Sequence, residues 1–315
     1  IKEYLAIRCG MQEIFTYPWM TDQYVNAILQ DTSGILALST PPSPDESLIR
    51  SSLLPNLCKA VVKNERFFTE FSIFECAQVF RDADYTTPYD SREKLPSQRK
   101  NIAGAFAGDS KNVTDLFRRA KGVIESMPRY THMEGFTFRQ EEKPLWADDV
   151  VWLNICLGDK RIGNLALLNK KASMACGIKN LSVLLFELDA DALVPFRSRT
   201  NTFTHLAEYP MTDYDISLLF DAQTKWADMQ KILSGIHNEL FHGASFVDEY
   251  HGKQIPEGKK SVTIRLTIGS AEKTLTSAEI EACAAWVPSS GQNKTPGGKS
   301  FSPLLFRKRS IYYFQ

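Results

Sequence analysis

The sequence contains no long hydrophobic run and no paired cysteine motif. None of its apolar stretches approaches the roughly 20 residues that a helix needs to cross a bilayer, so we expect no membrane partner. Its six cysteines are scattered, with no Cys-x-x-Cys pair and no histidine at the spacing of a zinc site. We expect them to be buried, reduced thiols of a cytoplasmic protein.

The sequence also lacks the motifs of several enzyme classes. It has no G-x-S-x-G, no H-E-x-x-H and no Walker loop. Gly252 and Gly258 enclose a segment that suggests a phosphate-binding loop, but such a loop leads into the N-terminus of a helix. Here the following residues have the pattern of a strand, so we interpret the segment as a β-hairpin turn. His237 and His242 are five residues apart, which does not place both on one helical face as a metal site would require.

Basic charge is scarce where a nucleic-acid-binding domain would need it. The chain carries 37 basic and 37 acidic residues. Residues 206–290 hold 7 Lys and Arg against 12 Asp and Glu, a difference of −5, whereas residues 291–315 hold 5 basic residues and no acidic one. A strong stand-alone nucleic-acid binder usually has a positive field over a whole domain, and no such field is present here.

The patterns that are present predict a mixed α+β domain over residues 1–205, built on a largely antiparallel sheet. Gly10 is a helix stop, Thr21 or Asp22 is a helix cap, and Gly158 with Asp159 marks a hairpin. We predict helices at 1–9, from about 21, at 49–62 and at 112–127, and strands at 13–17, 71–80, 101–107, 150–157, 161–168 and 183–188. A long hairpin loop is expected at 82–100.

A polar segment at 195–210 predicts a linker to a second domain at 206–290. The expected order there is strand, helix, strand, strand, helix, at 214–220, 226–240, 244–250, 261–268 and 277–286. This is the order of a ferredoxin-like split βαβ module that still lacks its last strand. Thr276 and Glu279 form a capping-box pattern before the final helix. The tail at 291–315 is of uncertain structure, with 304–307 or 311–314 as candidates for the missing strand.

Several side chains are candidates for function. Glu75 interrupts an apolar strand, which is costly unless the carboxylate is paired. We predict a structural role beside an arginine or a backbone donor; the alternative is a functional acid. In the second domain, basic side chains can reach a phosphate backbone and two tyrosines can stack on unpaired bases. These tentative nucleic-acid-binding residues are Tyr214, Tyr250, Lys253, Lys259, Lys260 and Arg265. The alternatives are a solvated hairpin tip for the cations and core or edge positions for the aromatic rings.

Five segments, in order along the chain, resemble β chains of bacterial phenylalanyl-tRNA synthetases. Residues 10–17 (GMQEIFTY) and 73–80 (IFECAQVF) are similar to two strands of that family, and residues 49–57 (IRSSLLPNL) to its helix entry. Residues 246–261 (FVDEYHGKQIPEGKKS) are close to the family pattern, and residues 274–276 (TLT) also fit. The resemblance covers roughly residues 1–287.

The resemblance implies a C-terminal half, with modules for tRNA entry and for editing lying before it. Residues 1–205 would be a catalytically inert domain on a class II synthetase-like antiparallel sheet, and residues 206–290 a ferredoxin-fold anticodon-binding domain. The family works as an α2β2 heterotetramer that joins phenylalanine to tRNA(Phe). ATP and Mg²⁺ are used by the holoenzyme, and we expect neither to be bound by this chain. The tentative contacts with the α subunit are Arg50, Leu53, Leu54, Pro55 and Leu57.

The residues agree with an inert domain. Class II chemistry needs an arginine in the second-motif strand and a Gly-rich, Arg-bearing third motif. The strand at 71–80, in the position of the second motif, has no arginine before Arg81. Residues 181–193 (LSVLLFELDADAL), in the position of the third motif, contain neither glycine nor arginine. Without those cations the charge of a polyphosphate is not offset.

Three departures from the family pattern remain. Residues 145–149 (LWADD) replace a His-Pro-Gly, residues 209–215 (YPMTDYD) carry acids where basic residues are usual, and the chain end does not look like the last strand of the family. We therefore expect weak tRNA binding by the second domain alone. The main hypothesis is a non-catalytic ligase subunit. The alternatives are a stand-alone class II enzyme and an RNA- or protein-binding module derived from the synthetase.

Overall fold

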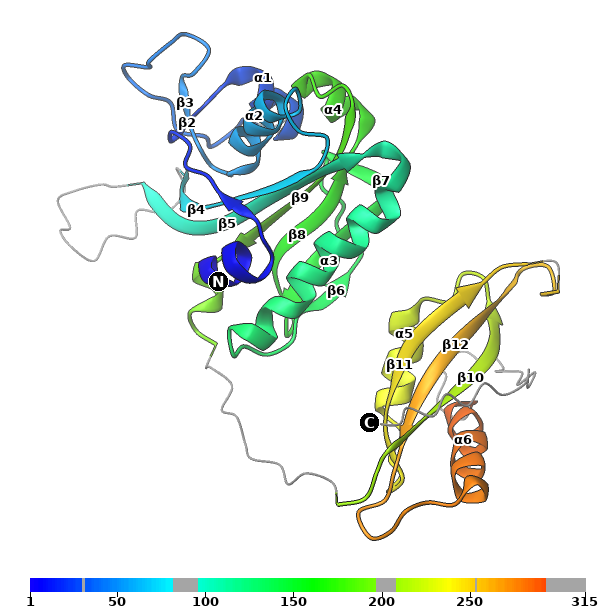
Figure 1. The fold of residues 1–315 in the computed structure, drawn as a ribbon. Helices are drawn as coiled ribbons and strands as arrows, with labels where there is room; N and C mark the ends of the chain where they lie inside the picture. The colour runs from blue at the N-terminus through cyan, green and yellow to red at the C-terminus, as the bar shows by residue number, and fades with distance from the viewer. Residues whose placement is uncertain (30–31, 82–95, 197–207, 253, 293–315) are drawn as a thin grey trace. The chain divides into compact units, whose positions relative to one another are not determined.

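The chain divides into two compact units, Ile1–Asn201 and Thr202–Gln315, in a computed structural model. The structure describes residues 1–29, 32–81, 96–196, 208–252 and 254–292. The division lies a few residues before the boundary expected at 205/206. The tail strands expected at 304–307 or 311–314, and Lys253, lie outside the described residues. Each unit is described by itself (Figure 1).

The first unit is built on a seven-stranded sheet with the order β1-β4-β5-β9-β8-β7-β6. The edge strand β1 pairs in parallel with β4, and the other neighbours are antiparallel. Its strands are β1 (Gln12–Glu13), β4 (Phe71–Arg81), β5 (Ser97–Asp109), β6 (Thr137–Arg139), β7 (Ala147–Leu157), β8 (Lys160–Leu168) and β9 (Leu181–Asp189). A separate two-stranded sheet joins β2 (Trp19–Met20) to β3 (Leu48–Ile49). The predicted mixed α+β architecture with a large sheet is confirmed.

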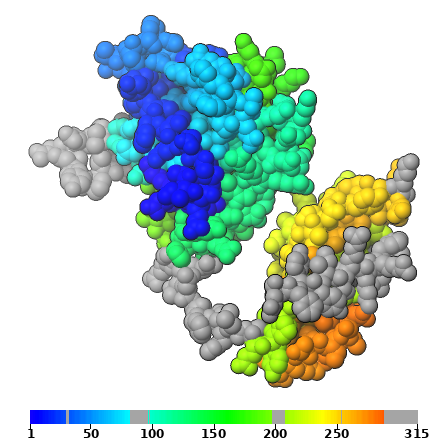
Figure 2. Space-filling model, viewed as in Figure 1, coloured from blue at the N-terminus to red at the C-terminus, as the bar shows by residue number. Residues whose placement is uncertain are grey.

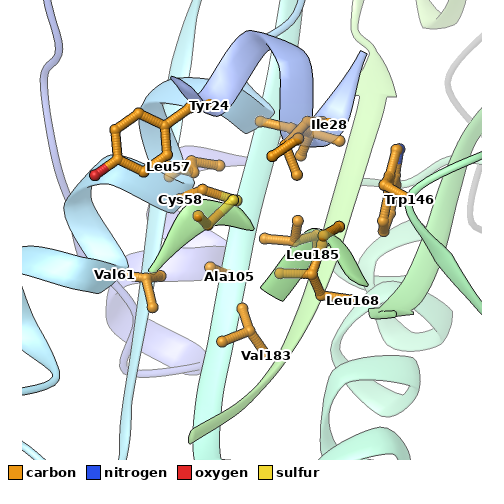
Figure 3. Close-up of a cluster of buried hydrophobic side chains, with 14 of the residues drawn as sticks. Tyr24, Ile28, Leu57, Cys58, Val61, Ala105, Trp146, Leu168, Val183 and Leu185 are labelled. Carbon is orange, nitrogen blue, oxygen red and sulfur yellow. The ribbon is translucent and has the colours of Figure 1, made fainter. Parts of the chain in front are cut away.

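Helices cover both faces of this sheet. The helical elements are η1 (Tyr4–Arg8), α1 (Asp22–Ile28), α2 (Leu54–Asn64), η2 (Ser110–Asn112), α3 (Val113–Tyr130), α4 (Lys170–Cys176) and η3 (Asp191–Leu193). Apolar residues of α1, α2 and α4 form one buried cluster with the sheet, and those of α3 and η1 form a second. Figure 3 shows part of the first cluster, with residues of α1 and α2 facing those of the sheet.

The period of two along β5 separates these clusters. Ala103, Ala105 and Ala107 belong to the cluster with α2, whereas Ile102 and Phe106 belong to the cluster with α3. The small alanine side chains leave room for α2 to pack closely on the sheet. The opposite face, which carries the large side chains, is covered by α3. The alternation of small and large residues thus fixes which helix each face accepts.

Two glycines are set by geometry. Gly158 has a φ of +58° in the tight turn between β7 and β8, as its hairpin pattern predicts. A Cβ atom on Gly163 would lie 2.1 Å from the carbonyl oxygen of Glu187, so only glycine allows β8 and β9 to pair this closely.

Element boundaries differ from the predictions in a few places. The helix predicted at 49–62 begins only at Leu54, because Leu48 and Ile49 pair with β2, and Pro55 then lies in the first turn. The helix predicted at 226–240 ends at Ser234, before Gly235. The short elements β2, β3, β6 and α4 were not predicted because each holds too few residues to show a period.

The second unit contains a three-stranded antiparallel sheet with the order β10-β12-β11. Its elements are β10 (Thr212–Asp221), α5 (Trp226–Ser234), β11 (Phe241–Tyr250), β12 (Lys259–Ile268) and α6 (Ser277–Gln292). Their order is the predicted one, and β11 pairs antiparallel with β12, the strand that follows it in the chain. Alternate residues of β10 and β12 pack with both helices in a single core.

The predicted capping box is present at the start of α6. The Thr276 hydroxyl and backbone N–H both donate to Glu279, each at 2.9 Å. A hydrogen bond from Lys273 makes the largest contribution, and hydrogen bonds from Thr276 add to it; together they lower the pKa of Glu279 to about 2. The carboxylate therefore remains charged at the N-terminus of the helix, where the helix dipole favours a negative charge.

The cysteines agree with the predicted reduced thiols. All six are free; Cys58, Cys156, Cys176 and Cys283 are buried as expected, whereas Cys9 and Cys76 are only partly buried. Within the described part of the chain, no helix is both long and apolar enough to cross a membrane.

Candidate functional site

Glu75 is a structural partner of an arginine, as its place in an apolar strand predicts. Its carboxylate is 1% exposed and lies 3.0 Å from the Arg50 guanidinium. The backbone N–H and the hydroxyl of Thr16 also donate to it, at 3.1 and 2.7 Å. The Nε of Arg50 donates to the backbone oxygen of Gln78. With its oxygens engaged in this way, Glu75 ties β4 to two preceding loops.

The five residues assigned to a subunit contact fill the interior of the first unit. Leu53 and Leu57 are fully buried, Leu54 is 3% exposed, and Pro55 is buried with them. Arg50 is 8% exposed and is held by Glu75. The apolar stripe that suggested an interface is the side of α2 that packs on the sheet, so these side chains offer no surface to a partner.

A second carboxylate, Glu187 on β9, holds the beginning of α2. It accepts a hydrogen bond from the Ser52 hydroxyl at 2.7 Å and one from the Leu53 backbone N–H at 2.9 Å. The Asn101 side chain donates to it as well, at 2.9 Å. Sequence reasoning missed this role, although the signal that marked Glu75, a carboxylate inside an apolar strand, is present here too.

A hollow of about 340 Å³ opens beside Glu187. It is bounded by the loop after α1, the start of α2, the end of β4, Trp146 just before β7, and one residue each of β8 and β9. Behind it lies Asn154, which is fully buried and donates to the Asn164 side-chain oxygen at 2.8 Å. The same Asn154 side chain holds the backbone of Glu141 and Glu142. The wall of the hollow is therefore fixed by a polar network.

Strands β4 and β9 carry few of the cations that a polyphosphate site needs. The only arginine of β4 is Arg81, its last residue. Both faces of β9 are buried. Val183 and Leu185 belong to the cluster with α2, and Leu184 and Phe186 belong to the cluster with α3. A set of cations along these strands, such as ATP needs, is not provided by their residues.

In the second unit, β10 and β12 form cross-strand pairs on the face opposite the core. Asp215 lies opposite Arg265 and accepts two hydrogen bonds from its guanidinium, at 2.8 and 2.9 Å. Asp221 lies opposite Lys259 at 2.6 Å. Both cations that were predicted to meet phosphate on this face thus carry an aspartate directly across the sheet.

The other candidates are distributed differently. Lys260 is 6% exposed, shares the core side of β12 and pairs with Glu249 at 2.9 Å. Tyr214 packs against the same core. Tyr250 is 50% exposed and lies opposite Ser261, on the face of Arg265. Of the six predicted residues, the structure brings Lys259, Arg265 and Tyr250 to one face, and Lys253 is outside the described residues.

The Glu249 carboxylate explains why Lys260 can be buried. Partial burial of Glu249 opposes its charge, but hydrogen bonds from Lys260 and His251 outweigh this effect and lower its pKa. The buried ammonium is therefore paired with a charged carboxylate. Over the described residues, no group of three or more His, Cys, Asp and Glu side chains is arranged to hold a metal ion.

Family models match both units in tandem. The model described as "Phenylalanyl tRNA synthetase beta chain CLM domain" matches residues 1–190. The chain belongs to this family. The model described as "Ferredoxin-fold anticodon binding domain" matches residues 207–295, which places the ferredoxin fold in the second unit. The resemblance found in the sequence motifs is confirmed.

Curated relatives of this family carry the name "Phenylalanine--tRNA ligase beta subunit". The protein from Carboxydothermus hydrogenoformans is 28% identical over 302 residues, which cover 92% of this chain and 37% of that protein. The protein from Bacillus subtilis is 27% identical over 282 residues, covering 86% of this chain and 34% of that protein. The chain thus spans about a third of the length of the relatives it matches.

Two solved structures of pyrrolysyl-tRNA synthetase from Desulfitobacterium hafniense are also similar. Their sequence identities are 15% and 14%, each with a TM-score of 0.48, covering 61% of this chain and 66% of theirs.

Proposed function

We propose that this chain is the non-catalytic, C-terminal part of a phenylalanine–tRNA ligase β subunit. The observation that carries the proposal is the match of the two family models, in order, to the two compact units. In this proposal the first unit is a class II-like sheet without chemistry of its own, and the second contacts tRNA(Phe). The partner is the α subunit of a cytoplasmic α2β2 enzyme, which uses ATP and Mg²⁺.

The inert role is supported by what the sheet residues do. Glu75 is engaged by Arg50 and Thr16, and Glu187 by the beginning of α2. A carboxylate held by such bonds orders the fold. The loss of phosphate-binding cations along β4 and β9 points the same way, because charge developing on a polyphosphate must be offset by fixed cations.

The N-terminal segment supplies a surface for the α subunit. Ile7, Phe15 and Tyr17 are 80%, 80% and 70% exposed, and exposed apolar side chains of this size are typical of interaction surfaces. The segment runs across the outside of the first unit, dark blue in Figure 2. We assign the subunit contact to these side chains in place of the buried residues of α2.

Size exclusion with light scattering, on this chain mixed with the α subunit of the same organism, tests the assembly. We expect a stable stoichiometric complex, and we expect Phe15→Ser with Tyr17→Ser to abolish it while the chain stays folded. The matched control is Phe67→Ser with Phe68→Ser, since Phe67 and Phe68 are exposed too but lie between α2 and β4. Separate elution of the native chains would contradict the subunit role and favour a stand-alone RNA-binding module.

The paired cations of the second unit predict weak, salt-insensitive tRNA binding by this chain. Replacing Asp215 with asparagine frees Arg265 from its carboxylate, so we expect tighter binding of tRNA(Phe). The slope of log K against log salt should steepen by about 0.7 for one added phosphate contact on a single-stranded region. Fluorescence anisotropy at several KCl concentrations measures both quantities.

The control for that measurement is Asp228→Asn. Asp228 is exposed on α5, away from the sheet face, and its replacement changes the net charge equally. An equal gain in both variants would show that only overall charge matters, and no gain in either would show that Arg265 does not meet phosphate.

A further inference from the structure

Two of the buried cysteines of the first unit belong to neighbouring helices. Cys58 on α2 is fully buried, and Cys176, the last residue of α4, is 1% exposed. Both are members of the first apolar cluster, part of which, with Cys58 and Tyr24 of α1, is drawn in Figure 3. The two thiols therefore lie where three helices pack on the sheet.

Two hydrogen bonds hold the end of α4 in this place. The side-chain nitrogen of Gln23, on α1, donates to the backbone oxygen of Ala175 at 2.9 Å. The backbone N–H of Lys179 donates to the carboxylate of Glu65, the residue that follows α2, at 3.1 Å. The segment that carries Cys176 is thus tied to α1 before the cysteine and to the end of α2 after it.

The two thiols are in direct contact. A hydrogen bond between them raises the pKa of Cys58, and burial adds to that rise; the same bond lowers the pKa of Cys176. Burial raises the pKa of the nearby Tyr24 hydroxyl, and both thiols add to this effect. A disulfide brings two sulfur atoms to about 2 Å, so thiols that already touch need only a small movement to form one.

Cys176 is the more reactive member of the pair. Its lowered pKa favours the thiolate, which is the form that reacts with an oxidant. It also ends a helix of only seven residues, in which Ala175 is exposed and Met174 is 70% exposed. A helix this short has little stability of its own, so local opening of α4 gives a small oxidant access to Cys176 while the rest of the unit stays folded.

We propose that Cys58 and Cys176 form a redox-sensitive pair, which a peroxide converts into a disulfide that fastens α4 to α2. Hydrogen peroxide transfers one oxygen atom to the Cys176 sulfur, which gives a sulfenic acid and one water. The Cys58 sulfur then attacks the sulfenic sulfur; the S–O bond breaks, and the hydroxide leaves with the Cys58 proton as a second water. In total, two thiols lose two electrons and two protons to one peroxide. This property rests on the packing of the first unit and does not depend on its role in a ligase.

Peptide mapping of the full chain after treatment with hydrogen peroxide tests the proposal. Remaining thiols are blocked with N-ethylmaleimide, and the chain is cut with trypsin without reduction. Cys58 and Cys176 then fall in the separate peptides 51–59 and 172–179, each with one cysteine. We expect these two peptides joined and two hydrogens lighter, at least about tenfold more abundant than any other linked pair, because contact gives a high effective concentration.

The same treatment in urea is the control for proximity. Unfolding separates the two helices, so the preference for this pair should disappear there. Oxidation of the partly buried Cys9 or Cys76 in the folded chain without any joined pair of 51–59 and 172–179 would overturn the proposal. An equal preference in urea would overturn it too, because the folded packing would then not be its cause.

Urea unfolding measures what the disulfide does to the fold. We expect peroxide to raise the midpoint of the first unit by about 1 M, because the cross-link closes a long loop in the unfolded chain, and dithiothreitol to reverse the rise. Cys176→Ala should abolish the rise. Cys156→Ala should keep it, since Cys156 is equally buried but lies on β7. An equal rise in both variants would contradict the pair, and the mapping of the native chain decides the case if either variant fails to fold.

Discussion

Replacing Glu75 with alanine is expected to lower the free energy of unfolding of the first unit by about 3–5 kcal/mol. The change leaves the Arg50 guanidinium, 8% exposed, without its carboxylate. It also removes the acceptor of both Thr16 donors. Urea titration read by peptide-resolved hydrogen exchange measures this loss and separates the first unit from the second.

The control is a pair of the same chemistry at the surface. Arg99 and Asp189 lie 3.1 Å apart with the arginine side chain 54% exposed, so Arg99→Ala should cost about 0–1 kcal/mol. The double variant Glu75→Leu with Arg50→Met should recover part of the stability, because it leaves no uncompensated buried charge. A loss below about 1 kcal/mol in Glu75→Ala would mean that water reaches Arg50 and that the pair is not buried in solution.

The replacement Leu57→Ala distinguishes a core residue from an interface residue. Leu57 is fully buried in the cluster that joins α2 to the sheet, so we expect a loss of about 2–5 kcal/mol in the isolated chain. A residue of a subunit interface would be exposed in the isolated chain, and its replacement would change the free energy of unfolding by no more than about 0.5 kcal/mol. The midpoint of urea unfolding, without the α subunit, gives the answer.

Met174→Ala serves as the matched control, since Met174 is a large apolar residue in the short helix α4 but is 70% exposed. Its midpoint should be nearly that of the native chain. Equal effects of both replacements would contradict the packing of α2 described above.

Local patterns in the sequence were sufficient for most of the fold. The largely apolar runs of β4, β5, β8 and β9 and the apolar stripe of α3 predicted these elements to within a few residues. The capping box at Thr276 and the hairpin at Gly158 were predicted because each depends on residues close in sequence. The short elements β6 and α4 were missed, since they are defined mainly by their pairing and packing with distant segments.

The candidate sites were harder to predict because they depend on what lies across the sheet. An apolar stripe on α2 has the same pattern whether it meets a partner or its own sheet, and the structure shows the latter for Leu53 and Leu57. Likewise, the charges of Lys259 and Arg265 are visible in the sequence, but the register that places Asp221 and Asp215 opposite them is not. A structural role for Glu187 could have been predicted in the same way as for Glu75, because both carboxylates interrupt an apolar strand. Its partners could not, because Ser52 and Asn101 lie more than 80 residues away in sequence.

The alternation of aspartate with lysine and arginine across β10 and β12 also bears on the kinetics of recognition. Opposite charges that lie directly across the sheet cancel within a few ångströms, so the face projects little field into solution. An RNA would approach it without electrostatic steering, at a rate near the roughly 10⁵–10⁶ M⁻¹ s⁻¹ of neutral partners. Correct and incorrect tRNAs would then arrive equally often, and selection between them would rest on how long each stays bound.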